Sequence, residues 1–265
     1  MSVLIAALLY PATLLLLASV EYTWQLVIGL LIFGFLANLI NIAMNTQAVS
    51  VEKIYGRSIM ASFHGLWSLA GFTGAVIGSL FVSNGLSPMW QFSIISIVAF
   101  ILVWSSHKYT LDDYNVKKAS SPSLFTRPDK YILTLGLIAF CCMLCEGAMA
   151  DWSGVYFQKV VTTKGISTTI GYVAFTFTMA GGRFLGDWVV AKIGVRQVLK
   201  FSGVLIFIGL MVAVLYPSAI VATAGFLLVG LGVSSVVPII YSLAGKSEHM
   251  PASVALSAVS TISFL

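Results

Sequence analysis

Long apolar runs with almost no charged residues restrict the fold of this chain more than any other feature. Several of them approach or exceed the ~18 residues that mark a membrane-spanning helix, and most polar segments between them are short. Mean hydropathy is +1.00 and only 9% of the residues are charged. The runs are continuously apolar, and lipid offers no water to the backbone, so the spans are expected to be helices. The pattern predicts an all-α, polytopic membrane bundle.

Eight complete spans and one partial span are expected. Their approximate ranges are Val3–Val20, Trp24–Ala48, Ser62–Val82, Met89–Ser106, Tyr131–Phe157, Thr168–Ile193, Val198–Tyr216 and Ala219–Leu243, with a fragment from Val254. Pro238 predicts a kink in the eighth. The last run stops at Leu265, short of the ~20 residues that a crossing helix needs. A truncated sequence is therefore expected.

One long polar segment, Ser105–Lys130, divides the chain and contains serine, proline and charges of both signs. Such a composition is typical of a linker. The expected organisation is a partial N-terminal bundle at 1–106, a linker at 107–130 and a partial C-terminal bundle at 131–265.

The basic residues fall on one side of the predicted bundle. If the spans alternate, eleven of the fourteen Lys and Arg residues lie on one side, whereas only Lys159 and Lys164 lie on the other and Arg183 lies within a span. Cytoplasmic loops carry this excess, so the linker is expected in the cytoplasm. The net charge of +5 then needs no nucleic-acid partner.

A glycine-rich, charged segment, AGGRFLGDWVVAKIGVRQVLK, ends the sixth span. Its glycines permit close helix approach, and its acidic residue can bond a neighbouring helix end. The pattern G-R-x-x-G-D followed by K-x-G-x-R resembles the loop signature of the major facilitator superfamily, although the usual acidic position is Ala191 and Asp187 lies about one turn earlier. The residues of this conformational-switch loop are Gly182, Arg183, Gly186, Asp187, Lys192, Gly194 and Arg196.

Two further segments, Asn45–Gly71 and Glu146–Phe157, resemble a bacterial inner-membrane subgroup of this superfamily, loosely related to fucose-permease-type symporters. The resemblance implies a twelve-helix transporter from which this chain holds helices three to six, seven to ten and the start of eleven. It also implies proton-coupled secondary transport of a small polar solute, a sugar or related metabolite, by alternating access. The expected protein is monomeric when complete, sits in the lipid bilayer and needs no cofactor or metal.

Other functions stay open at this stage. Efflux of amphipathic compounds is one, although drug antiporters of the superfamily typically have a Gly-Pro motif in the helix matching Ser62–Val82, which contains no proline. A non-transporting receptor on the same scaffold is another. An enzyme is not expected, because intramembrane aspartyl proteases need G-x-G-D and the sequence before Asp187 is Phe184-Leu185-Gly186.

Asn38, Asn41 and Asn45 share one narrow stripe of the second span with Glu52. The stripe is a candidate solute path, and the alternative is hydrogen bonding between helices. Trp67 and Trp152 are candidates to stack on a solute or to fill the bundle.

Glu146 lies near the middle of the fifth span, where a charge costs about 2.5–3.5 kcal/mol on insertion scales. Glu146 is therefore the first candidate for proton coupling, and Asp151 is the second. Asp151 lies about 140° around the helix, so both cannot face one cavity. Arg183 is expected to pair with Asp187 at i+4, with anion binding as the alternative. The clustered cysteines Cys141, Cys142 and Cys145 are expected to pack as small apolar groups.

Overall fold

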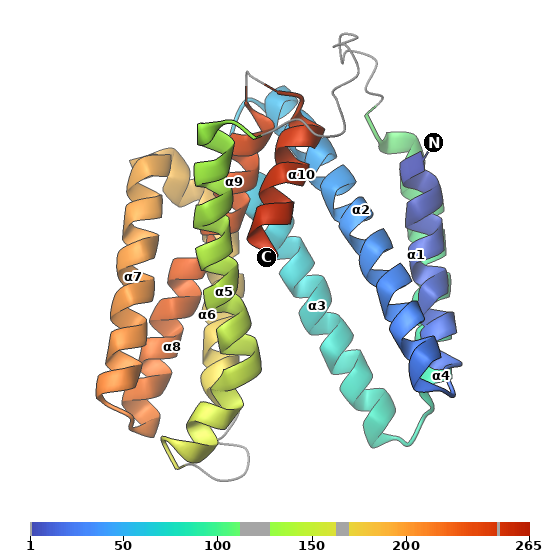
Figure 1. Cartoon of the computed structure of the whole chain (residues 1–265), viewed down its shortest axis with the longest axis horizontal. Coiled ribbons are helices and arrows are strands. Elements are labelled where there is room, and N and C mark those ends of the chain that lie inside the picture. The colour runs from blue at the N-terminus through green and yellow to red at the C-terminus, as the bar shows by residue number, and fades with distance from the viewer. Residues whose placement is uncertain (1, 112–127, 163–169, 248–249) are drawn as a thin grey trace. The chain divides into compact units, whose positions relative to one another are not determined.

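The computed structural model describes residues 2–111, 128–162, 170–247 and 250–265 (Figure 1). Every regular element in these ranges is helical. The elements are α1 (Ser2–Ala18), α2 (Thr23–Tyr55), α3 (Met60–Ser83), α4 (Pro88–Ser106), the 3₁₀ turn η1 (His107–Tyr109), α5 (Lys130–Lys159), α6 (Ile170–Ile193), α7 (Val195–Leu215), α8 (Ala219–Ser234), α9 (Val236–Gly245) and α10 (Ala252–Ser263).

The all-α membrane architecture predicted from the apolar runs is confirmed. Five segments of the described chain are long and apolar enough to cross a bilayer: Thr23–Tyr55, Met89–Tyr109, Lys130–Lys159, Val195–Leu215 and Ala219–Gly245. α1 and α6 are not among these five segments. α1 has 17 residues, and α6 contains three charged side chains within its 24 residues. A helix lies in each expected range, while the number of eight spans and one partial span stays a prediction.

The span Ala219–Gly245 is divided into α8 and α9 at Ser235. Pro238 lies three residues further on and has no N–H to donate to the preceding turn, which interrupts the helical hydrogen bonds there. The next donor, Ile239 N, bonds to Ser235 O at 3.2 Å. The predicted proline kink therefore takes the form of a break between two helices.

Contacts group the chain into two units. The first comprises Met1–Val51 and Ala70–Thr126, and the second comprises Glu52–Leu69 and Arg127–Leu265. The end of α2 and the first part of α3 thus group with the C-terminal helices. The predicted division at the linker, which assigned all of 1–106 to one bundle, stays a prediction.

Within the first unit, α1 packs along α4. The buried Ser96 hydroxyl of α4 donates to the carbonyl of Pro11 in α1 at 2.8 Å. Tyr10 of α1 stacks on Phe33 of α2 with ring centroids 4.7 Å apart.

Within the second unit, α8 packs between α6 and α7, while α5 packs on α9 and α10 (Figure 1). Gly209 of α7 and Gly225 of α8 lie against each other's backbone. A Cβ added to Gly209 would lie 2.5 Å from Gly225 O, and one added to Gly225 would lie 2.6 Å from Gly209 O. Small residues permit such backbone contact between membrane helices.

Gly209→Ala is expected to lower the thermal unfolding midpoint, because the added methyl group forces α7 and α8 apart at a cost of about 1–3 kcal/mol. Gly203→Ala in the same helix is the matched control, since outside the nearby backbone of α7 itself no atom lies within 4 Å of its added Cβ. Unfolding of the two detergent-solubilised variants should show the loss for Gly209→Ala alone. Equal midpoints would contradict this account of the interface.

Candidate functional site

The first turn of α3 is held by two carboxylates, both of which belong to the second unit. The first is Glu52, from the last turn of α2, which is 2% exposed. Its Oε2 accepts hydrogen bonds from Ile59 N at 3.2 Å and Met60 N at 3.1 Å. Its Oε1 accepts from the Ser242 hydroxyl of α9 and the Lys246 ammonium. A buried carboxylate with this many donors has its charge well compensated.

The second carboxylate is Asp187 of α6. Its Oδ1 accepts from Ala61 N at 3.1 Å, and its Oδ2 accepts from Ser62 N at 2.8 Å and Ser62 Oγ at 2.6 Å. The Ser58 hydroxyl also donates to Oδ1, at 3.2 Å. The first N–H groups of a helix have no partner within it, and negative charge is favoured there. Glu52 and Asp187 together accept from four consecutive N–H groups, at residues 59–62.

This arrangement corrects the expected pairing of Arg183 with Asp187. The carboxylate of Asp187 is used by α3, and Arg183 instead pairs with Glu146 of α5, with 3.7 Å between Nη2 and Oε1. The prediction failed because spacing along one helix cannot show what a neighbouring helix offers. Here a helix N-terminus provides two backbone donors, which compete successfully for the carboxylate.

Arg183 is the centre of a partly buried polar group that we call the Arg183 cluster: His64, Ser68, Glu146 and Arg183. Its Nη1 donates to the Ser68 hydroxyl of α3, and Ser68 Oγ in turn donates to His64 O at 3.0 Å. The exposed fraction is 7% for Arg183 and 5% for His64. The cluster therefore joins α3, α5 and α6 inside the second unit.

Three buried polar atoms of the cluster have no hydrogen-bond partner within the described chain: Arg183 Nε, Glu146 Oε2 and His64 Nε2. Buried polar atoms are nearly always hydrogen-bonded in folded proteins. The His64 ring lies between aromatic groups, with centroids 6.0 Å from Trp67 and 5.9 Å from Tyr241. Arg183 thus has an N–H donor without an acceptor, and Glu146 has an acceptor oxygen without a donor, within the described chain.

The sequence of the whole chain matches one protein family. The profile of the Major Facilitator Superfamily (MFS) covers residues 1–265. The chain belongs to this superfamily. Its relatives include an uncharacterised MFS-type transporter of Yersinia pestis, which is 36% identical over 240 residues, 89% of this chain and 61% of that protein.

Two further relatives come from rhizobia. An uncharacterised transporter of Sinorhizobium fredii is 30% identical over 247 residues, which cover 90% of this chain and 63% of the relative. The membrane protein MosC of Rhizobium meliloti is 30% identical over 259 residues, 98% of this chain and 63% of MosC. The chain thus spans about three fifths of the length of these relatives. Because MFS proteins are transporters, the expectation that the chain is not an enzyme is confirmed.

The residues predicted to form the conformational-switch loop lie in the second half of α6 and at the start of α7. A Cβ added to Gly186 would lie 2.7 Å from Ser235 Oγ and 3.0 Å from Ala61 Cβ, so this glycine lets α6 approach α3 and the break between α8 and α9. Gly194 has a φ of +81°, which an L side chain rarely adopts, and forms the tight turn between α6 and α7. Of the remaining residues, Gly182 is buried, whereas Lys192 and Arg196 are exposed. The Lys192 ammonium lies over the Trp188 ring.

The polar stripe on α2 of the MFS chain is partly satisfied within its own helix. Asn45 Nδ2 donates to Asn41 Oδ1 at 2.6 Å and to Asn41 O at 2.8 Å. Asn38 is exposed, and Glu52 serves the N-terminus of α3. The solute-path assignment of Asn38, Asn41 and Asn45 stays a prediction.

Asp151 and both candidate tryptophans lie outside the buried part of the cluster. Asp151 is exposed, and Trp67 and Trp152 are 63% and 66% exposed. Trp152 lines an apolar cavity of about 200 Å³ between α5, α7 and α8, beside Tyr156, whose hydroxyl donates to Ala213 O at 2.5 Å. These positions do not assemble a polar site around Asp151.

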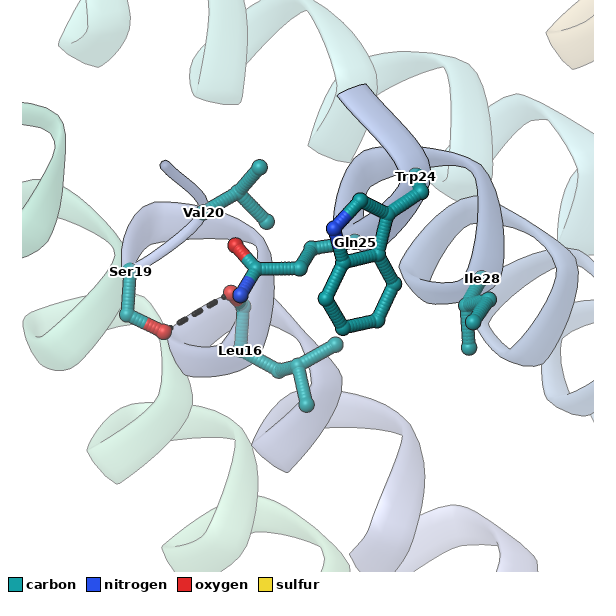
Figure 2. Close-up of a pocket in the computed structure, with 6 residues that line it drawn as sticks. All are labelled: Leu16, Ser19, Val20, Trp24, Gln25 and Ile28. Atoms are coloured by element: carbon teal, nitrogen blue, oxygen red, sulfur yellow. Dashed lines mark hydrogen bonds between the residues drawn. The ribbon is translucent and has the colours of Figure 1, made fainter. Parts of the chain in front are cut away.

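A second cavity, of about 270 Å³, lies in the first unit where α1 turns into α2 (Figure 2). Its two polar side chains are already bonded locally: Ser19 Oγ donates to Leu16 O at 2.9 Å, and Gln25 Oε1 accepts from Glu21 N at 3.0 Å and Tyr22 N at 3.1 Å. The other lining residues are Leu16, Val20, Trp24 and Ile28. The cavity has no charged lining residue, so the Arg183 cluster is the better candidate site.

Sequence reasoning missed His64 and Ser68. Neither residue is among the candidates that the sequence suggests. A signal was available, because the two are four residues apart and share one face of α3. That signal cannot show that α6 supplies an arginine to the same face.

Proposed function

We propose that the protein carries a small polar solute, a sugar or related metabolite, across a bacterial inner membrane by alternating access and couples this movement to protons as a symporter. MFS membership supports transport as the function. The bacterial origin of the relatives supports a bacterial membrane as the location. The observation that carries the proposal is the Glu146–Arg183 pair. Its groups are 3.7 Å apart on two apolar helices, with side chains 25% and 8% exposed.

A buried pair of this kind suits proton coupling. The ionised Glu146 is stabilised by Arg183, and a proton on Glu146 removes that attraction and frees the guanidinium. The two protonation states therefore favour different arrangements of α5 and α6. A ligand or proton can shift a conformational equilibrium only through such a difference between states. Glu146 is the proposed coupling residue, and Asp151 is the second candidate.

The conformational-switch loop is proposed to govern the exchange between inward-open and outward-open states. Asp187 accepts four hydrogen bonds from the first turn of α3 and its preceding segment. This contact must persist or break as a unit, because the carboxylate is shared by adjacent donors. It offers a two-state element of the kind that alternating access requires.

The proposal is tested with the product of the complete reading frame that contains this sequence, reconstituted into vesicles. A pH gradient should drive accumulation of a labelled solute chosen from a panel of sugars and sugar derivatives, and collapse of the gradient by a protonophore should stop it. Accumulation that ignores the protonophore, or binding without any uptake, would overturn the proposed function. The latter outcome would favour a receptor.

The membrane topology gives a separate prediction. The loops at Lys53, Lys117, Arg196 and Lys246 should face the cytoplasm, and those at Ser83, Lys164 and Pro217 should face outward, because basic residues collect on the cytoplasmic side. Single cysteines at these positions are labelled with an impermeant reagent, in a background without Cys141, Cys142 and Cys145. Labelling of residue 117 from outside would contradict the topology.

A further inference from the structure

The Arg183 cluster contains an arginine whose hydrogen-bonding capacity is mostly unused. Nη1 bonds Ser68, Nη2 lies 3.7 Å from Glu146, and Nε has no partner in the described chain. Charge-assisted N–H···O bonds are normally about 2.7–2.9 Å long. The contact with Glu146 is therefore loose, and a better-fitting acceptor can compete with it.

The planar guanidinium is suited to one kind of acceptor. Its parallel N–H groups match the two oxygens of a carboxylate in a bidentate contact that a lysine cannot reproduce. His64 adds a second polar atom without a partner, Nε2, on the facing helix α3. Both side chains are more than nine-tenths buried.

Charge balance limits what can bind beside this arginine. In the structure, one positive group, Arg183, faces one negative group, Glu146. A second carboxylate would leave a net negative charge in a buried site, which is strongly unfavourable. An anion can replace Glu146 at Arg183 without this penalty only if a proton enters the cluster, on Glu146 or on His64.

Glu146 is the better acceptor of this proton, because a proton on Glu146 frees Arg183 for the anion. A proton on His64, which is 5% exposed and lies beside the Trp67 and Tyr241 rings, would add a second buried positive charge and leave Glu146 at the guanidinium. Arg183 of α6 pairs with Glu146, and Tyr241 of α9 lies beside the His64 ring of α3. On α5 itself lie Cys142 and Cys145, and the Cys142 thiol contacts Val233 O at 3.8 Å. The neighbouring helices α8 and α10 contain no ionisable side chain.

From these observations, and resting on the proposed function, we propose that the solute carries a carboxylate, that Arg183 binds this carboxylate, and that binding is linked to uptake of one proton by Glu146. The solute anion replaces the Glu146 carboxylate at the guanidinium, and an O–H bond forms on Glu146 from a solvent proton. The charge of the cluster is the same before and after. The solute class is a small hydroxylated monocarboxylate, such as a sugar acid or hydroxy acid.

Binding is measured on the product of the complete reading frame in lipid nanodiscs, with matched probe pairs. The pairs are gluconate and sorbitol, glucuronate and glucose, glycerate and glycerol, and formate and formamide. At least one acid should raise the thermal unfolding midpoint more than its neutral partner. In weakly buffered solution with an indicator dye, that acid should cause uptake of one proton per anion bound.

Three variants separate a binding role from a structural one. Glu146→Gln should keep anion binding and abolish proton uptake, because the side chain is already neutral. Arg183→Lys keeps the charge and the fold but loses the bidentate contact, so anion affinity should fall about 10-fold or more. Lys200→Gln, at an exposed position on α7, is the control for non-specific attraction and should bind as the parent does.

The outcomes distinguish this inference from the proposed function. If no acid exceeds its neutral partner, or if a neutral probe binds with proton uptake at Glu146, the carboxylate assignment is overturned while proton-coupled transport stands. If an acid binds with proton uptake but vesicles never accumulate it, the site stands and the proposed transport function fails.

Discussion

Replacing Glu146 by glutamine is expected to abolish solute accumulation driven by a pH gradient while leaving solute exchange intact. Glutamine keeps the size of the side chain and holds it in a neutral state, like protonated glutamate. The loose 3.7 Å contact with Arg183 disappears as a charge interaction, but Arg183 keeps its bond to Ser68. The carrier can then bind and exchange solute without a proton. A proton gradient can therefore no longer drive solute accumulation.

The measurement compares two assays on the same vesicles, gradient-driven uptake and counterflow with solute on both sides. Asp151→Asn is the matched carboxylate change on the same helix, at an exposed position, and should retain gradient-driven uptake. If Glu146→Gln still concentrates solute like the parent and Asp151→Asn does not, Asp151 is the coupling residue instead.

The helices of this fold could be predicted from the sequence because each is marked by a continuous run of apolar residues. A run of apolar residues is visible without knowing what it contacts. Helix ends were less predictable, as α2 shows: the apolar run suggested an end near Ala48, whereas the helix continues to Tyr55. The extra turns carry Glu52, whose charge suggests solvent but whose carboxylate is buried against α3 and α9. Hydropathy marks where the lipid-like environment ends, not where the helix ends.

The candidate site was predictable as single residues but not as pairs. Glu146, Arg183 and Asp187 were each noticed because a charge in an apolar helix requires compensation. The pairing of Arg183 with Asp187 was wrong, since sequence spacing favours the nearest opposite charge. The actual partners are supplied by α3 and α5, from more than 30 residues away, and only the folded structure brings them together.

A second large effect is expected at Asp187, where substitution by asparagine should slow transport about 10-fold or more while solute affinity changes less than about 3-fold. The carboxylate accepts from Ala61 N, Ser62 N and two serine hydroxyls. Asparagine offers one acceptor oxygen and turns an amide donor toward the other N–H groups. Hydrogen bonds to a charged group contribute about 1.5–3 kcal/mol each, so the state that contains this contact is selectively destabilised.

Affinity should be nearly unchanged because Asp187 lies about 6 Å along the helix from Arg183 and directs its carboxylate at α3 rather than at the cluster. Ser58→Ala is the matched control, since it removes only the longest of the four bonds, at 3.2 Å, and leaves the charge facing the helix N-terminus. Equilibrium binding and counterflow rates of the three proteins separate the two roles. A large loss of binding in Asp187→Asn with a normal exchange rate would place Asp187 in the solute site and remove it from the conformational switch.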